Sequence, residues 1–220
     1  MSQADNQALL NQAKVAIESG NCADAIPLLL PLAENGNIEA QFLLGYMYFA
    51  DCEYPFPASV ARDWLMRARE QGHASACYHL AWFPNEQGLS SIDDKESMNL
   101  LIEAGERGSV EAQRHLGACF ATGDWIGGKD EAKAVEWYMK AAAQGDAESQ
   151  YDLGFMMLLG EGTAQNTLKG MEWLNQAAEQ GNESACSLLA DIHGKGLFGV
   201  SNDPEKVRYW EEMCSKKGEI

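Results

Sequence analysis

The chain has 220 residues, and its hydrophobic content of 46% is ordinary for a folded protein, which argues against disorder. Its net charge is −17, and residues 1–61 hold a single basic residue, Lys14, against seven acids. Nucleic acids and anionic lipids are bound through Lys and Arg, so this charge excludes both as expected ligands and favours a basic protein partner. The alternative, that the acidity only keeps the protein in solution, stays open.

The start of the chain predicts a cytoplasmic protein. Residues 1–6 lack the basic start and apolar run of a signal peptide. No apolar stretch approaches the roughly 20 residues that span a bilayer, so membrane insertion is not expected.

The first predicted elements are two helices over residues 4–19 and 22–35, joined by a turn at Gly20 and Asn21. The first helix carries an apolar stripe of Ala8, Leu9, Ala13, Ala16 and Ile17. We expect this pair, residues 1–35, to cap an array of repeats.

From residue 36 onward a glycine recurs every 36 or 37 residues, and we call these the marker glycines: Gly36, Gly72, Gly108, Gly145 and Gly181. A period in this range indicates stacked supersecondary units that share one core. The predicted repeats are residues 36–71, 72–107, 108–144, 145–180 and 181–217, within a single repeat domain over residues 1–220.

Each repeat begins with a predicted helix, called helix A. A small residue lies four positions after the marker glycine, and another lies nine positions after it. Between them, eight positions after the marker, every repeat has a leucine: Leu44, Leu80, Leu116, Leu153 and Leu189. Small and large residues at these spacings share one helical face, which is typical of close helix packing.

A second predicted helix, helix B, ends each repeat, and the last one spans about residues 204–217. Its large apolar residue lies eight positions before the next marker glycine, or before Gly218 in the last repeat. This residue is a tryptophan at Trp64, Trp137, Trp173 and Trp210. A smaller residue follows one turn later, so the stripe should fill the space between helices. The marker glycine is then well placed as a left-handed C′ residue.

The loops between helices A and B differ along the chain. Gly123, Gly160 and Gly196 share one position where helix A should end, whereas Asp51 and Gln87 stand there in the first two repeats, next to Pro55, Pro57 and Pro84. Asp93 and Asp130 are expected to cap the helices that follow them, and Asp203 with Pro204 predicts another helix start.

The cysteines form no CxxC or paired metal-ligand spacing. Cys77 and Cys186 occupy the same repeat position and are predicted to be small buried residues between helices. Cys186 and Cys214 could face each other across the last helix pair, but in a cytoplasmic chain we expect them to be reduced.

Several positions that recur in register resemble the Sel-1-like repeat, a relative of the tetratricopeptide repeat. The fourth repeat carries the pattern most fully, from Gly145 through Leu153, Gly154, Gly160 and Trp173 to Gly181, and residues 134–145 repeat its second half. The resemblance covers roughly residues 22–218, and residues 72–107 match it least. It implies an all-α fold: a right-handed α/α superhelical solenoid of about six antiparallel helix pairs, with the A helices lining a concave face.

The expected binding residues lie seven and ten positions after the marker glycines, where the sequence varies most and where the two positions share a face. We predict a partner-binding concave face that includes Tyr46, His79, Trp82, His115, Asp152, Phe155 and Asp191. Aromatic residues concentrate binding energy at interfaces, so Tyr46, Trp82 and Phe155 are the expected anchors. The alternative is that these rings only pack against neighbouring A helices.

The sequence gives little support for a catalytic site or a metal site. His79, His115 and Asp152 form a row that could hold a metal ion, but solvent-facing polar groups on a binding surface explain the row better. The GxGxxG at residues 194–199 lies between two predicted helices, whereas a dinucleotide site needs it between a strand and a helix. No enzyme, cofactor or metal is expected.

The predicted function is therefore a non-enzymatic protein–protein interaction module that binds a basic protein or peptide in its concave groove. One alternative is an immunity or inhibitor protein that neutralises a secreted bacterial toxin or effector. Others are a subunit that joins two larger proteins and, least supported, a hydrolase that uses groove carboxylates.

Overall fold

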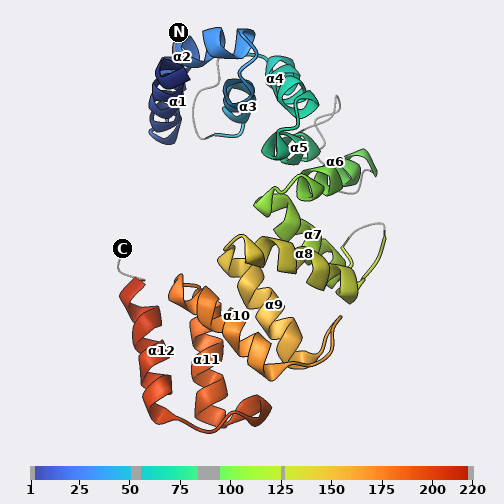
Figure 1. The fold of residues 1–220 in the computed structure, drawn as a ribbon, viewed down its shortest axis with the longest axis vertical. Coiled ribbons are helices and arrows are strands. Elements are labelled where there is room, and N and C mark those ends of the chain that lie inside the picture. The colour runs from blue at the N-terminus through green and yellow to red at the C-terminus, as the bar shows by residue number, and fades with distance from the viewer. Residues whose placement is uncertain (1–2, 51–55, 84–94, 125–126, 218–220) are drawn as a thin grey trace. The chain divides into compact units, whose positions relative to one another are not determined.

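The computed structural model describes residues 3–50, 56–83, 95–124 and 127–217, and within them it forms helices and no strand. Figure 1 shows the helices in chain order. Their bounds are α1 Gln3–Glu18, α2 Cys22–Glu34, α3 Ile38–Tyr46, α4 Ala58–Glu70, α5 Ala74–Ala81, α6 Lys95–Glu106, α7 Val110–Thr122, α8 Glu131–Ala143, α9 Ala147–Leu159, α10 Thr167–Glu179, α11 Glu183–Lys195, the short 3₁₀ helix η1 Leu197–Gly199, and α12 Pro204–Lys217. The all-α class and the expected helix pairs are confirmed.

The helices form two compact units, residues 1–112 and 113–220. In the first unit each helix from α1 to α6 packs against the next, and the A helices α1, α3 and α5 also contact one another in order. In the second unit α8 to α12 pack in the same sequential way. Consecutive A helices of the first unit therefore form one continuous face.

The marker glycines end the B helices as predicted. All five have positive φ, between 86° and 96°, a conformation that side-chain-bearing residues rarely adopt. The residue after each marker glycine caps the next A helix, because its side chain accepts a hydrogen bond from a backbone N–H three residues on. These caps are Asn37, His73, Ser109, Asp146 and Asn182. One glycine and one capping residue together make each turn.

Helices A and B approach closely where the sequence has its small residues. A methyl group added at Gly154 would lie 2.9 Å from the carbonyl oxygen of Gly170, and one at Gly45 would lie 2.8 Å from that of Ala61. The repeated leucines beside these positions are all buried. Trp137 and Trp210 are buried, whereas Trp64 and Trp173 are half-buried.

Glutamine side chains, which the sequence reading did not single out, link successive repeats. Gln71 donates to the side-chain oxygen of Gln41 at 2.7 Å, and Gln41 donates to the carbonyl of Ala33 at 3.0 Å. Gln180 and Gln150 repeat the amide pair at 2.7 Å in the second unit. Polar bonds therefore accompany the apolar packing between repeats, and they favour one register of stacking.

Cys77 and Cys186 are buried, as predicted, and Cys77, Cys186 and Cys214 are not disulfide-bonded. Cys186 and Cys214 direct their sulfur atoms to different backbone carbonyls, those of Ala178 and Glu183. Cys22, at the start of α2, is disulfide-bonded. Disulfides persist in oxidising surroundings, so this bond bears on the cytoplasmic expectation, which stays a prediction.

The loops agree with the sequence where they are described. Gly123, Gly160 and Gly196 all have positive φ at the ends of A helices. Asp130 and Asp203 accept hydrogen bonds from backbone N–H groups at the starts of α8 and α12. The expectations for Asp51, Pro55, Pro84, Gln87 and Asp93 concern residues outside the described ranges.

Candidate partner-binding surface

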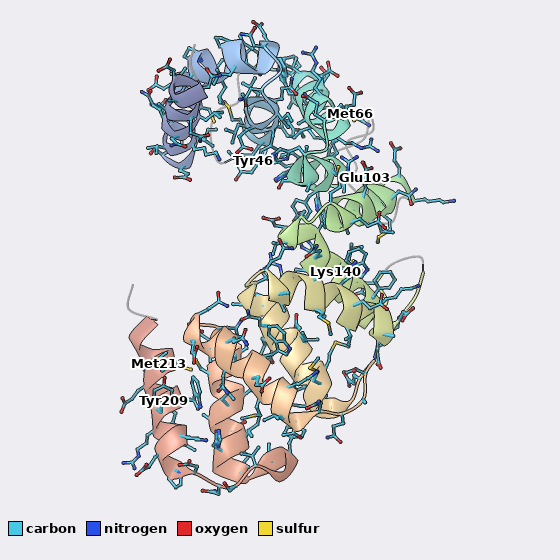
Figure 2. All side chains as sticks on the ribbon, viewed as in Figure 1. Tyr46, Met66, Glu103, Lys140, Tyr209 and Met213 are labelled. Carbon is cyan, nitrogen blue, oxygen red and sulfur yellow. The ribbon has the colours of Figure 1, made fainter. Side chains whose placement is uncertain are left out.

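Aromatic side chains gather on the A helices of the first unit. Phe42 and Tyr46 lie one turn apart on α3 with ring centroids 5.7 Å apart, and Phe49 follows just beyond the helix. His79 of α5 lies against all three, with its centroid 5.7 Å from Phe42, 5.1 Å from Tyr46 and 5.0 Å from Phe49. We call these four residues the aromatic cluster, and Figure 2 labels Tyr46 in it.

The aromatic cluster continues along α5. Tyr78 contacts His79 at 5.2 Å and Trp82 at 6.1 Å, so Trp82 joins the cluster through Tyr78. Phe83 lies 5.6 Å from Phe49 and stacks on Tyr48 at 4.9 Å. Two predicted anchors, Tyr46 and Trp82, therefore lie on one aromatic surface together with predicted His79, and all three are half-buried.

Burial controls the charge of His79. Desolvation is the largest influence and lowers its pKa to about 4, although the nearby Glu111 carboxylate opposes the shift. The ring is consequently neutral at physiological pH. It acts in the cluster as a flat aromatic group rather than as a cation.

A charged group borders the cluster at Glu39. Its carboxylate accepts hydrogen bonds from His73 Nε2 at 3.1 Å and from Lys14 Nζ at 2.6 Å. The hydrogen bond from His73 is the largest cause that lowers the pKa of Glu39, to about 2, and Lys14 adds to it against the effect of burial. His73 also stacks on Phe42 at 4.3 Å, so charged and aromatic groups are fixed to one another.

A cavity of about 660 Å³ lies beside the cluster, between the end of α1 and α3. Its lining includes Phe42, Tyr46 and Phe49 from the cluster. The remaining wall comes from Lys14, Ile17, Glu18, Ser19, Gly20, Glu39, Leu43 and Ala50. This volume is in the range that holds a large side chain or small ligand.

The second unit places the other predicted residues on α7, α9 and α11. Asp152 is half-buried on α9 and shares a hydrogen bond with Tyr138 of α8, and burial raises the pKa of Asp152 to about 6. Glu148 and Asp146 add to that rise, whereas the Tyr138 bond and Arg114 oppose it. Ionisation of the Asp152 carboxylate therefore costs free energy in the folded protein.

The remaining predicted residues differ in exposure. Phe155 is 36% exposed and stacks on Tyr151 at 6.3 Å. Asp191 is exposed and pairs with Lys195 at 2.9 Å, and His115 is half-buried on α7. The binding role of these residues stays a prediction.

The sequence reading missed one repeated feature of this surface. The residue six positions after the marker glycine is aromatic in three repeats and pairs with the aromatic residue one turn later. These pairs are Phe42–Tyr46, Tyr78–Trp82 and Tyr151–Phe155. The i, i+4 spacing of these aromatic pairs is visible in the sequence. The sequence prediction used only the most variable positions, seven and ten after the marker glycine, and therefore left out position six.

The structure offers no assembled metal site in its described part, since no group of three or more His, Cys, Asp or Glu side chains could hold an ion there. The GxGxxG segment forms the end of α11 and the 3₁₀ helix η1, and Gly196 is the left-handed C-cap. It lies between helices, as predicted, and not after a strand. No described helix has the length and hydropathy to cross a membrane.

The family model for the Sel1 repeat matches residues 38–50, 74–109, 110–146, 147–182 and 183–212. The chain therefore belongs to the Sel1 repeat family, as the repeat pattern predicted. Proteins of this family and fold are generally protein-interaction modules and typically not catalysts.

One known protein similar to this chain comes from mouse. The mouse DAP3-binding cell death enhancer 1 is 32% identical over 114 residues, which cover 52% of this chain and 22% of the mouse protein. The chain thus spans about a fifth of the length of that relative. The match says nothing of the rest of the larger protein.

Two solved structures cover nearly the whole chain. A Sel1 repeat protein from Oxalobacter formigenes has a TM-score of 0.76 at 24% identity, over 96% of this chain and 88% of the other. An immunity protein from Pseudomonas aeruginosa has a TM-score of 0.63 at 18% identity, over 98% and 82%. At these identities the likeness establishes the solenoid fold.

Proposed function

We propose that this chain is a non-enzymatic binding module that captures a basic protein or peptide on the A-helix face of residues 1–112. The observation that carries the proposal is the aromatic cluster beside the cavity between α1 and α3. Aromatic residues at a solvent-accessible hollow are the usual anchors of protein interfaces.

The negative charge of this chain supports the proposal that its partner is basic. The net charge is −17, and residues 1–61 contain Lys14 as their single basic residue. Lys14 is itself paired with Glu39, so it contributes little free positive charge to this face. An acidic surface attracts and orients a basic partner before contact.

The test is partner capture by the full chain and by the variants Tyr46→Ala and Trp82→Ala. We expect both variants to keep their helical circular dichroism and to lose most capture of a partner isolated with the unchanged protein. Met139→Ala is the matched control, because Met139 is an exposed apolar residue on helix B α8. Full capture by the Tyr46/Trp82 double variant would refute the proposed surface.

An immunity protein that neutralises a toxin or effector is the second candidate. It is supported by the fold shared with an immunity protein from Pseudomonas aeruginosa over 98% of this chain and 82% of that one. The acid excess also suits one-to-one neutralisation of a basic partner.

Co-expression separates the two candidates. If the gene's neighbour encodes a toxic protein, an immunity protein should restore growth of cells that produce this toxin, and a general adaptor should not. Growth arrest that persists although the two proteins bind each other would refute the immunity role and leave the binding role intact.

A further inference from the structure

We propose that the cavity between α1 and α3 binds the guanidinium group of a partner's arginine side chain. This proposal deepens the proposed function and rests on it, since it names the chemical group that the binding face would recognise. Three independent features of the cavity favour a planar cation: its aromatic wall, its unpaired carboxylate and the helix end that forms its rim.

The aromatic wall is formed by Phe42, Tyr46 and Phe49, which all line the cavity. Elsewhere the chain covers its own rings with its own cations: Arg67 lies 4.5 Å from the ring centroid of Trp64, and Lys140, labelled in Figure 2, lies 3.7 Å from that of Trp137. Among the described residues no such cation covers the three rings of the cavity. His73 stacks on Phe42, but the parts of the three rings that line the cavity can still attract a cation from outside.

The charges of the cavity leave one acid unmatched. Lys14 is the cavity's cation, and its amino group lies 2.6 Å from Glu39, which neutralises it. Glu18 is exposed on the rim, and no described Lys, Arg or His lies within ion-pair distance of it. A cation that enters the cavity would find the Glu18 carboxylate free.

The third feature is the C-terminal end of α1. Ile17, Glu18, Ser19 and Gly20 line the cavity, and they form the last turn of α1 and the residues just after it. A helix C-terminus carries partial negative charge and favours cations, yet the last turn of α1 contains no basic residue. Arginine fits best, because its guanidinium stacks on rings and hydrogen-bonds a carboxylate at the same time.

The probe is N-acetyl-arginine-N-methylamide, compared with the citrulline analogue, which has nearly the same shape and no charge. We would titrate each into the isotope-labelled full chain and follow the side-chain NMR signals of Ile17, Phe42 and Tyr46. The arginine probe should shift these signals saturably, and the citrulline analogue should not. Equal binding of the two probes, or no saturable shift with arginine, would overturn the proposal.

The variant Glu18→Gln tests the carboxylate, and Glu34→Gln, an exposed acid on α2 outside the cavity, is its control with the same change in net charge. We expect Glu18→Gln to weaken arginine binding by about 2- to 5-fold and Glu34→Gln to leave it unchanged. An equal effect of both variants would show that only overall charge matters and would overturn the cavity assignment. We expect both variants to stay folded, because both positions are exposed.

Failure of this proposal can be told apart from failure of the binding function. If the arginine probe does not bind the cavity while Tyr46→Ala and Trp82→Ala still abolish partner capture, the arginine assignment is wrong and the proposed binding face is retained. If the probe binds but neither variant affects capture, the cavity assignment stands and the proposed partner surface is wrong.

Discussion

At the scale of single residues, burial shifts the pKa values of two ionisable groups on the A helices in the direction that favours their uncharged forms. Burial lowers the pKa of His79 to about 4 and raises that of Asp152 to about 6. Both shifts have the same physical origin, which is the cost of placing a charge where water is partly excluded.

Asp152→Asn should therefore stabilise the protein near neutral pH. The folded-state pKa of Asp152, about 6, is higher than its ordinary value of 3.8, so the carboxylate destabilises the fold increasingly as pH rises through this window. We expect a gain of up to about 3 kcal/mol above pH 6 and almost none below pH 4. Urea unfolding at the two pH values measures this difference.

The matched control is Asp191→Asn, which removes an exposed acid from the neighbouring A helix α11. An exposed ion pair contributes little, so this variant should change stability by less than about 1 kcal/mol at either pH. If Asp152→Asn behaves like Asp191→Asn, burial does not control the ionisation of Asp152.

At the scale of the helix, closeness of packing depends on one small position in each repeat. Gly154 of α9 meets Gly170 of α10 so closely that neither can carry a side chain without moving the other's backbone. The tight contact brings Leu153, Leu158 and Leu174 into a fully buried core. Glycine is needed at both positions, because each faces a backbone atom of the other helix, and backbone cannot move aside as easily as a flexible side chain.

Gly154→Ala should destabilise the protein although alanine favours helices. The new methyl group would lie 2.9 Å from the Gly170 carbonyl oxygen, so we expect a loss of about 1–3 kcal/mol from overpacking. The control is Gly194→Ala on α11, where the nearest atom lies 3.5 Å away. There alanine should stabilise by up to about 1 kcal/mol. Thermal unfolding of both variants should give shifts of opposite sign, and shifts of the same sign would contradict the packing argument.

At the scale of the whole molecule, covalent and polar links supplement the repeated core. The glutamine pairs and the Arg69–Glu103 contact, at 2.7 Å, connect one repeat to the next. Figure 2 labels Glu103, which also pairs with Arg107 at 2.7 Å. The disulfide at Cys22 differs from these polar links because it depends on the redox state of the surroundings.

Reduction of the disulfide should lower the stability of the chain by about 2–4 kcal/mol, because a crosslink restricts the unfolded state. Urea unfolding with and without reductant measures the loss, and Cys22→Ser should reproduce it. Cys214→Ser is the control, since Cys214 is free. Alkylation of protein taken from its native source without reductant tests the compartment: a reactive Cys22 would agree with the cytoplasmic expectation, and an unreactive one would contradict it.

Much of the fold could be predicted from the sequence because the same helix-end and core-packing pattern occurs in every repeat. Five marker glycines in register identify the helix ends, and five leucines identify the core face. The candidate site was only partly predictable. The predicted residues Tyr46, His79 and Trp82 lie on one aromatic surface, and their binding role stays a prediction. Phe42, Phe49, Glu39 and Glu18 were missed, since their roles depend on contacts between helices.

The sequence by itself determined the family, the helix pairs and the repeated buried leucines, because these follow from short-range spacing that every repeat must satisfy. Only the tertiary structure decided which side chains meet across helices. It placed the His79 ring against three aromatic rings, neutralised Lys14 on Glu39, and opened the cavity at the end of α1. Contacts between residues far apart in the sequence produce no periodic pattern, so they cannot be read from the repeats. The proposed binding surface is built from such contacts.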